Sequence, residues 1–329
     1  MRKIVLSGMR PTGNLHIGHL SVIENWIRLQ EEYDANFFVA DYHALTTQFD
    51  DTARLQENIR NMILDWLAIG LDPEKATLFI QSRIPEHAEL YLLFSMITPL
   101  SWLERVPTYK GQVDQFREQE GKDITTHGFL GYPMLQAADI LLYMADYVPV
   151  GEDQLPHLEI TREIARRFNH LYDRKLFPEP EGLLARIPML PGTDGRKMSK
   201  SYNNYINIMA PEEELLQQVR SMVTDPERIR KTDLGHPDIC TVYKYQTIYN
   251  ATEAPEIYES CKAGGIGCAD CKKKLFQTLN TLLLPMRERR EAIAGNEEYL
   301  REVLAFGEEK ARKKAGEGIR LVKEAMNLL

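Results

Sequence analysis

Two short segments far apart in the chain carry side chains suited to binding phosphate. The first, His16-Ile17-Gly18-His19, follows a turn rich in glycine and proline and begins a predicted helix. The free N–H groups and the dipole at a helix N-terminus favour an anion, and Gly18 leaves room for a base or a ribose beside the backbone. The two histidines can donate hydrogen bonds to a polyphosphate, although a capped helix with surface histidines would show the same residues.

The second segment is Lys197-Met198-Ser199-Lys200-Ser201, in a loop at 188–201 that contains two prolines and two glycines. Two lysines and two hydroxyls on a loop of this kind can hold a phosphate chain whose charge changes during a reaction. A lysine-rich loop alone is usually only solvated. Its occurrence downstream of the first segment, outside the predicted sheet, favours a shared function in nucleotide chemistry.

All four cysteines lie close together in the second half of the chain. Cys240, Cys261, Cys268 and Cys271 have the spacing C-x20-C-x6-C-x2-C. Clustered cysteines in a cytosolic chain are more often metal ligands than disulfides. Zinc ribbons usually have two close CxxC pairs, whereas this chain has one, so the spacing favours an iron–sulfur cluster over Zn²⁺. Zinc and free thiols remain alternatives.

The elements that must position these residues alternate between strands and helices in the first half of the chain. Apolar runs predict strands at 3–7, 36–41, 76–81 and 147–150, and helical periodicity predicts helices at 16–32, 54–69, 88–97, 133–145 and 155–169. This alternation predicts an α/β fold with a Rossmann-like, doubly wound parallel sheet covered on both faces. Ligands of such sheets bind at the carboxyl ends of the strands.

Strand-like runs become scarce further along, which divides the chain into two predicted domains. Residues 1–205 form the Rossmann-like domain, with a polar, less regular insertion near 100–130 and the lysine-rich loop. Residues 206–329 form a mostly α-helical domain, with amphipathic segments at 211–223, 272–294 and 297–327 and the four cysteines.

The bulk composition is that of an ordinary globular protein. The chain has 329 residues, of which 43% are hydrophobic and 27% charged, and its net charge of −8 argues against a nonspecific nucleic-acid coat. It still contains local basic clusters such as Lys272–Lys274. No apolar stretch approaches the roughly 20 residues of a membrane span, and the N-terminus lacks the pattern of a signal peptide. We therefore expect a soluble, cytoplasmic protein with no membrane partner.

The pair His16–His19 and Lys197–Ser201 resembles the HIGH and KMSKS signatures of class I aminoacyl-tRNA synthetases. Gly151-Glu152-Asp153-Gln154 resembles the GxDQ element of their tryptophanyl and tyrosyl branch. The segments SGMRPTGNLHIGHL, ADYHALT, LQAADILLY and VPVGEDQLPHLEITR are similar to the tryptophanyl enzymes over most of the first 205 residues.

The resemblance implies an amino-acid-activating ligase. The carboxylate of tryptophan attacks the α-phosphate of ATP in line, pyrophosphate leaves, and tryptophan is then transferred to tRNA(Trp). Catalysis by this route needs positioning and charge stabilisation rather than a protein nucleophile. By position the resemblance assigns catalysis to His16, His19, Lys197 and Lys200. It assigns ATP binding to Arg10, Pro11, Thr12, Gly18, His19, Gly151, Glu152, Asp153, Ile187, Lys197, Met198, Ser199, Lys200 and Ser201, with Mg²⁺ bridging the phosphates.

The amino acid pocket follows from helical geometry once tryptophan is the expected substrate. Tyr132, Gln136 and Asp139 lie at i, i+4 and i+7, on one polar face opposite Leu135, Ile140 and Leu142. An indole N–H is only a donor, so a buried site needs an acceptor, and Asp139 is the candidate. Gln136 and Tyr132 would hold the α-amino group. The rest of the pocket would be lined by His43, Val148, Val150 and Gln154.

The same pattern leaves alternatives open. Tyrosyl enzymes also have Tyr-x3-Gln-x2-Asp, where the aspartate takes the phenol, and some tryptophanyl enzymes have methionine in place of Gln136. A non-catalytic RNA-binding paralogue and a ligase of small acids are further alternatives, which the two intact signatures disfavour. The resemblance also implies a homodimer with its interface near 100–130, an anticodon-binding role for 206–329, and membership of the subset with a [4Fe–4S] cluster on four C-terminal cysteines.

Overall fold

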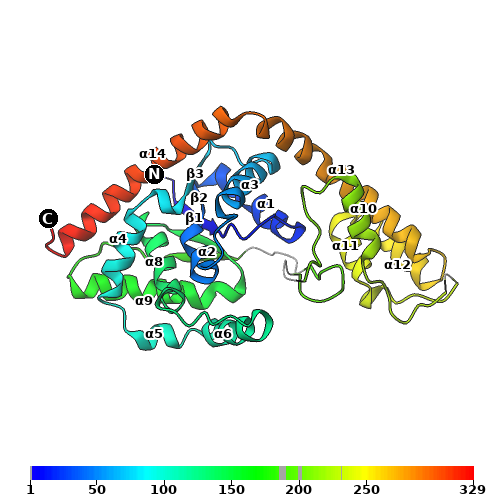
Figure 1. Cartoon of the computed structure of the whole chain (residues 1–329), viewed down its shortest axis with the longest axis horizontal. Helices are drawn as coiled ribbons and strands as arrows, with labels where there is room; N and C mark the ends of the chain where they lie inside the picture. The colour runs from blue at the N-terminus through cyan, green and yellow to red at the C-terminus, as the bar shows by residue number, and fades with distance from the viewer. Residues whose placement is uncertain (1, 185–189, 199–201, 231) are drawn as a thin grey trace.

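One parallel sheet forms the centre of the molecule. The computed structural model describes residues 2–184, 190–198, 202–230 and 232–329. Its described strands form a five-stranded sheet in the order β3-β2-β1-β4-β5, all parallel (Figure 1). The strands are β1 (Ile4–Met9), β2 (Asp34–Val39), β3 (Ala76–Ile80), β4 (Tyr147–Val150) and β5 (Glu181–Leu184). The predicted Rossmann-like α/β class is confirmed, with β5 as a strand that the sequence did not predict.

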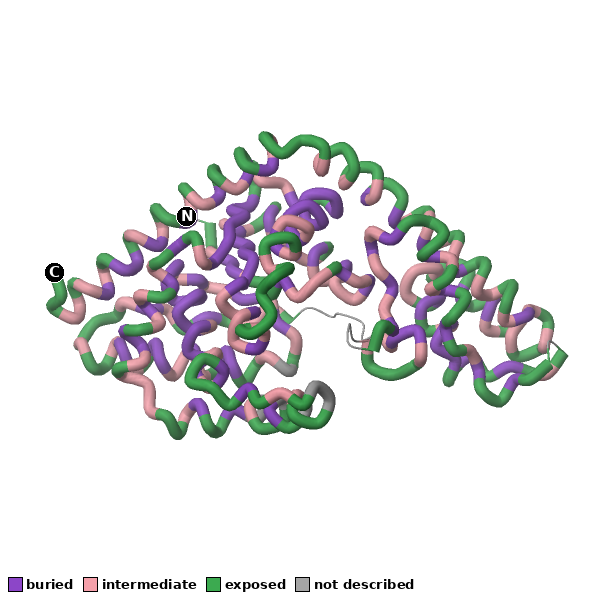
Figure 2. Tube along the Cα trace, in the orientation of Figure 1, coloured by how far each residue is buried: buried purple, intermediate pink, exposed green. Residues whose placement is uncertain are grey.

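Successive residues of the central strands point into two separate cores, because side chains alternate across a strand. Val5, Phe37 and Leu78 pack against α1 (Ile17–Glu32) and α3 (Leu55–Ile69). Leu6, Phe38 and Phe79 face the opposite side, which is covered by α4 (Glu86–Ser95), α8 (Tyr132–Leu142) and α9 (Leu155–Leu171). Figure 2 shows the buried strands between these two layers of helices. The sheet is therefore covered on both faces, as predicted.

The segment 100–130 is more regular than predicted. It contains α5 (Leu100–Glu104), α6 (Pro107–Glu120) and α7 (His127–Leu130), and another helix outside the prediction, α2 (Asp41–Gln48), follows β2. Pro107 lies in the first turn of α6, and Gly121 ends that helix in the left-handed conformation with φ 62°. Because α6 is largely polar, its sequence lacks the apolar stripe by which helices are recognised.

Beyond residue 205 the regular elements among the described residues are helices. They are α10 (Glu212–Ser221), α11 (Thr241–Tyr249), α12 (Ala254–Lys262), α13 (Cys268–Ala294) and α14 (Glu297–Ala325). Within the described ranges the remaining helices are short 3₁₀ helices: η1 (Gln81–Arg83), η2 (Glu152–Gln154) and η3 (Pro237–Ile239). None of the described helices combines the length and the apolar composition needed to span a bilayer.

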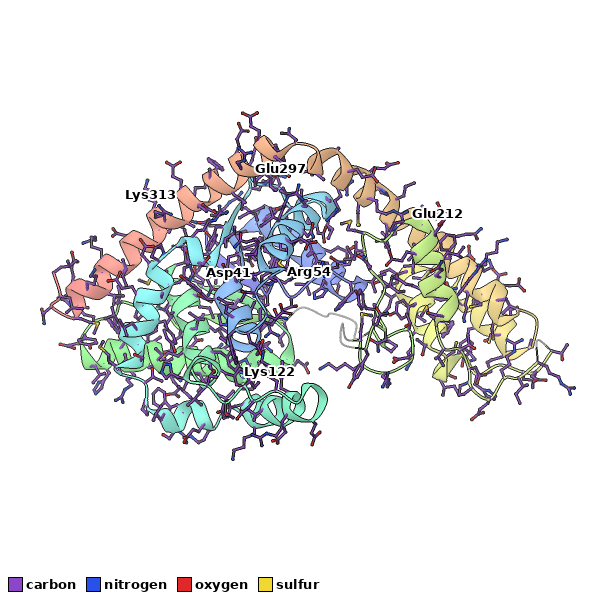
Figure 3. All side chains as sticks on the ribbon, in the orientation of Figure 1. Asp41, Arg54, Lys122, Glu212, Glu297 and Lys313 are labelled. Atoms are coloured by element: carbon purple, nitrogen blue, oxygen red, sulfur yellow. The ribbon has the colours of Figure 1, made fainter. Side chains whose placement is uncertain are left out.

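Helices α13 and α14 form a long arch that joins the cysteine-bearing end of the molecule to the sheet (Figure 1). Leu279 and Leu283 of α13 share a core with α1 and α3. α14 then runs past β3, α4 and α8. At its beginning Glu297, labelled in Figure 3, forms an ion pair with Arg60 of α3. The residues after 205 are thus packed directly on the sheet layers.

Two glycines let α14 approach the backbone of its neighbours. A Cβ atom on Gly307 would lie 1.8 Å from the carbonyl oxygen of Leu78, and one on Gly318 would lie 2.1 Å from that of Leu142. Such separations are impossible for real atoms, so any larger residue at either position must push the helix away from β3 or α8.

Candidate active site

A cavity of about 350 Å³ opens at the carboxyl ends of β1, β2 and β4, where ligands of open α/β sheets bind. Its wall contains nine of the residues expected at the site: Arg10, His43, Tyr132, Gln136, Asp139, Val148, Val150, Gly151 and Gln154. The wall also contains apolar side chains such as Phe38, Phe129 and Ile140. All the residues expected to bind tryptophan therefore share one pocket that combines aromatic surface with a few polar groups, as a site for an aromatic amino acid requires.

Asp139 is the most buried charged group of the pocket, with 1% of its surface exposed. Its Oδ2 accepts a hydrogen bond from His43 Nε2 at 2.9 Å, and its Oδ1 accepts one from His87 Nδ1 at 2.6 Å. Gln81 Nε2 donates to both oxygens, at 2.7 and 2.9 Å. Asp139 therefore does not face solvent. Most residues of α8, on nearly all sides of the helix, are buried.

These donors control the ionisation of Asp139. Burial acts to raise the pKa of its carboxyl group, but the hydrogen bonds and charges of His43 and His87 outweigh this, and the net result is a pKa below the usual value of 3.8. The group therefore remains an acceptor-only carboxylate at neutral pH, which suits it to a ligand that offers an N–H or O–H donor.

A second chain of hydrogen-bonded polar side chains also lines the cavity. Tyr132 Oη lies 2.6 Å from His157 Nε2, and His157 Nδ1 lies 2.9 Å from Gln154 Oε1. Arg10 is exposed to the cavity close to Tyr132; desolvation lowers the pKa of its guanidinium, and the Tyr132 hydroxyl opposes that shift. The pocket wall thus combines a carboxylate with a hydroxyl, an amide and a cation.

The turn between β1 and α1 brings the first signature segment to the sheet edge. Pro11 is buried, Thr12 N donates to Arg10 O at 2.9 Å, and Gly13 adopts φ 110°, which only glycine adopts readily. His16 is the N-cap of α1, where its backbone N–H donates to His19 Nδ1 at 3.1 Å and the two rings lie 3.8 Å apart. Both imidazoles are therefore held at the helix N-terminus.

The second signature segment lies against the first. The sulfur of Met198 is 3.8 Å from the position of a Cβ on Gly18, and the backbone at His16 pairs with that at Asn207. Lys197 is exposed, and its carbonyl accepts a hydrogen bond from Asn204 Nδ2 at 3.1 Å. Ile187, Ser199, Lys200 and Ser201, also expected to bind ATP, lie outside the described residues.

Gly151 and its neighbours complete the cavity rim. Gly151 lines the pocket at the end of β4, and Glu152 is exposed on η2. The backbone of Asp153 lies in the same 3₁₀ helix. These positions lie on the same edge of the sheet as the turn at Arg10, since both follow the carboxyl ends of neighbouring strands β1 and β4.

Comparison with known proteins identifies the fold and the chemistry together. Residues 2–284 match the family described as tRNA synthetases class I (W and Y). The chain is 53% identical to the tryptophan–tRNA ligase of Thermotoga maritima, with 99% of each chain covered. The chain belongs to the tryptophan–tRNA ligase family. It is also 44% identical to the tryptophan–tRNA ligase of Aquifex aeolicus, with 98% of this chain and 99% of that protein covered.

A solved member of the tryptophan–tRNA ligase family has the same architecture. The tryptophanyl-tRNA synthetase of Campylobacter jejuni, determined in complex with ADP and tryptophan, superposes with a TM-score of 0.88 at 34% identity, covering 98% of this chain and 99% of that one. The chain is thus an aminoacyl-tRNA synthetase. Its membership of the tryptophan–tRNA ligase family argues against the alternatives of a tyrosyl enzyme, a non-catalytic paralogue and a ligase of small acids.

The four cysteines of this family member surround one small cavity at the far end of the molecule. Cys240, Cys261, Cys268 and Cys271 come from three separate segments, and Arg228 and Asp225 complete the wall. Arg228 Nη1 donates to Cys261 Sγ at 3.7 Å, and Gln246 Nε2 donates to Cys271 Sγ at 3.6 Å. Burial raises the pKa of Cys271 to about 11. Within the described ranges, no group of three or more His, Cys, Asp or Glu side chains stands arranged to hold a metal ion.

Among the polar groups that hold this site, Gln81, His87 and His157 were not predicted from the sequence, nor were apolar wall residues such as Phe129. Gln81 and His87 contact Asp139 from β3–α4, and His157 joins Tyr132 to Gln154. Of the three, only His157 could have been predicted from the sequence. It lies three residues after Gln154, and residues at that spacing lie on the same side of a helix. Nothing in the spacing of Gln81 and His87 points to α8, since only the fold brings them together.

Proposed function

We propose that this synthetase activates L-tryptophan with ATP to tryptophanyl-adenylate and pyrophosphate, and transfers the amino acid to tRNA(Trp). The observation that carries the proposal is the buried Asp139 carboxylate in the wall of a cavity that is also lined by aromatic and aliphatic side chains. The N–H of an indole ring can donate a hydrogen bond to the Asp139 carboxylate. A ring without such a donor would leave the buried carboxylate without that hydrogen bond, which is unfavourable. The names of the relatives support tryptophan as the amino acid.

The polar side chains near Tyr132 would hold the ammonium and carboxylate groups of the amino acid. Tyr132 and Gln154, tied together by His157, offer oxygen acceptors for the α-ammonium group, and Gln136 lines the same wall. This arrangement would direct the carboxylate toward Arg10 and the helix N-terminus. His43, Val148 and Val150 would complete the pocket around the ring.

ATP would bind across the sheet edge between the two signature segments. His16, His19 and Lys197 would hold its phosphates, with Gly18 and Met198 beside the adenosine, and Pro11 and Thr12 would shape the turn below it. Gly151, Glu152 and Asp153 would face the ribose, and Ile187, Ser199, Lys200 and Ser201 complete the proposed set. Mg²⁺ would be held mainly by the phosphates, which is how the ion usually binds in such sites. The in-line displacement then needs only positioning and charge stabilisation.

ATP–pyrophosphate exchange with tryptophan and with tyrosine at equal concentration tests the proposal. Exchange that depends on tryptophan and is absent with tyrosine is the expected result. Exchange with tyrosine alone would move the chain to the tyrosyl specificity, and exchange with neither would overturn the proposed activity.

We infer in addition that the four-cysteine cavity holds a [4Fe–4S] cluster, with Zn²⁺ as the alternative. What supports this proposal is the kind of donor and its position: four thiols line one cavity, and N–H groups of Arg228 and Gln246 are directed at two of the sulfurs, although the thiols do not converge on one point. Thiolates bound to iron or zinc are stabilised by such donors. A group held by these four residues would link the start of α11 to α12 and α13.

Metal analysis and absorption spectroscopy of protein purified without oxygen test the cysteine site. Four irons per chain and a broad visible absorption that the double variant Cys268→Ser/Cys271→Ser lacks are expected. One zinc per chain without visible absorption would favour the Zn²⁺ site instead. If neither metal is found, the four cysteines are free thiols.

The helical region after residue 205 would bind the anticodon part of the tRNA, and two chains would form a homodimer. Basic residues such as Lys272, Lys273 and Lys274 on α13 support the first assignment, because phosphate contacts dominate RNA affinity. Exposed apolar residues at the end of α4 and in α5, next to the segment 100–130, support the second.

A further inference from the structure

The Asp139 carboxylate is held from two directions by different kinds of neighbour. His43 approaches from the cavity, whose wall it helps to form. His87 and Gln81 approach from the protein interior; neither belongs to the cavity wall, and both are completely buried. A ligand can therefore compete with His43 for the carboxylate, but it cannot reach the contacts made by His87 and Gln81.

His87 is itself fixed by a second hydrogen bond. Its Nε2 lies 3.0 Å from the hydroxyl of Tyr143, which is 3% exposed. Burial and the nearby Asp139 charge keep the pKa of Tyr143 well above its usual range, so the hydroxyl keeps its proton. Because the Asp139 carboxylate only accepts hydrogen bonds, His87 Nδ1 carries a proton directed at Asp139 Oδ1, while Nε2 is occupied by the Tyr143 hydroxyl.

The packing around His87 also fixes the ring plane. Its ring centroid lies 5.9 Å from that of Phe38, 6.0 Å from Phe79 and 5.4 Å from Tyr143. A buried polar ring in such apolar surroundings is stable only when its nitrogens are paired. An apolar residue would fill this space at lower cost, so the two hydrogen bonds are the specific contribution of histidine.

We propose that His87, oriented by Tyr143, is a positioning residue that fixes the Asp139 carboxylate so that it selects substrates with a ring N–H. This rests on the proposed function, in which Asp139 is the indole acceptor. A carboxylate offers about four acceptor sites. With His87 and Gln81 occupying those on the interior side, the site shared with His43 is presented to the cavity, and free rotation of the carboxylate away from the substrate is prevented.

The test measures kcat/KM in pyrophosphate exchange for tryptophan and for β-(benzothiophen-3-yl)alanine, in which sulfur replaces the ring N–H. The variants are His87→Leu, His87→Asn and Tyr143→Phe, and the packing control is Phe79→Leu, which alters the same core without removing a hydrogen bond to Asp139. We expect His87→Leu to lower the preference for tryptophan about tenfold or more, the usual effect of losing one hydrogen bond to a charged group. His87→Asn, whose amide can still donate, should restore part of the preference.

The pattern across variants separates positioning from structure. If His87 only stabilises the core, His87→Leu and Phe79→Leu will lower kcat/KM for both substrates by the same factor, and the proposal is overturned. Tyr143→Phe removes the hydroxyl but keeps the aromatic ring, so it can be measured even if His87→Leu does not fold. We expect Tyr143→Phe also to lower the preference for tryptophan over the sulfur analogue. Asp139→Ala, which removes the acceptor oxygens, separates the positioning role of His87 from the acceptor role of Asp139. A preference that collapses in Asp139→Ala but survives in His87→Leu and Tyr143→Phe overturns only the positioning role, whereas a preference unchanged in Asp139→Ala overturns both assignments.

Discussion

Asp139 illustrates how a protein can keep a charge inside an apolar core. Its carboxylate loses its hydration on folding and regains hydrogen bonds from His43, His87 and Gln81. Transfer of an unpaired carboxylate into such surroundings would be prohibitive, whereas a fully hydrogen-bonded one remains ionised. The donors thus do two things at once: they make burial possible and they leave the group as an acceptor.

The depressed pKa of Asp139 predicts how stability responds to acid. Because its pKa in the folded state lies below the usual 3.8, ionised Asp139 stabilises the fold fully above that value, and the contribution is lost as the pH falls through the folded pKa. Asp139→Asn should therefore lower the free energy of unfolding most above pH ~5, with the difference from the wild type shrinking below pH ~4. Urea unfolding at several pH values measures this. A difference that grows toward low pH would contradict it.

Tyr132 allows a prediction about the amino end of the substrate. Tyr132→Phe removes the hydroxyl that meets His157, and we expect kcat/KM for tryptophan in pyrophosphate exchange to fall about tenfold or more, since hydrogen bonds to charged groups are worth about 1.5–3 kcal/mol. The matched control is Tyr109→Phe, because Tyr109 stacks on Phe129 outside the cavity wall. Equal losses in both variants would indicate a packing effect and count against a role for the hydroxyl.

At the same scale, the sequence named residues that line one cavity in the structure, but not the buried residues that contact them. Tyr132 and Asp139 were predicted from helical spacing and the resemblance, and Gln154 as a further residue of the pocket wall. Gln81 and His87 could not be predicted, since their relation to Asp139 depends on how β3 and α4 pack against α8. Spacing along one helix is local information, whereas a buried network joins elements that are distant in sequence.

At the scale of elements, the glycines of α14 allow a matched comparison. Gly307→Ala and Gly318→Ala place a Cβ against the carbonyls of Leu78 and Leu142, so each should lower the free energy of unfolding by about 1–3 kcal/mol or more. Gly316 lies on the same helix with open space around it, and Gly316→Ala should raise stability by up to about 1 kcal/mol. Denaturant titration of the three variants tests this; a stabilising Gly307→Ala would show that α14 does not pack closely on β3.

Two of the elements that sequence analysis missed share a physical cause. β5 is short and half exposed, and α6 is mostly polar, so neither has the apolar periodicity that reveals a strand or a helix. The long helices α13 and α14 were predicted nearly to their ends because their apolar positions recur over many turns. What periodicity could not reveal is that α14 returns to the sheet, because its closest contacts are made by glycines, which have no side chain to form a pattern.

At the scale of the whole molecule, the proposed homodimer predicts a specific weak point. Leu92, Met96 and Leu100 are 55%, 66% and 63% exposed, an unusual surface for large apolar residues unless it is covered. Met96→Glu should convert the dimer to a monomer at micromolar concentration, as measured by light scattering after size exclusion. Leu284→Glu, on exposed surface of α13, is the control and should stay dimeric. A wild-type chain that is monomeric at all concentrations would refute the assignment.

The course of α14 has a consequence for how the chain is made. β3 is an edge strand, and α14 lies across that edge, with Val303 in the core on one side of the sheet and Ala311 in the core on the other. The ribosome delivers β3 before α14. Until α14 leaves the exit tunnel, the nascent sheet therefore presents an apolar, unprotected edge, the kind of surface that recruits other strands. Premature termination before α14 would leave a polypeptide that contains every side chain proposed to act in catalysis yet is prone to aggregate.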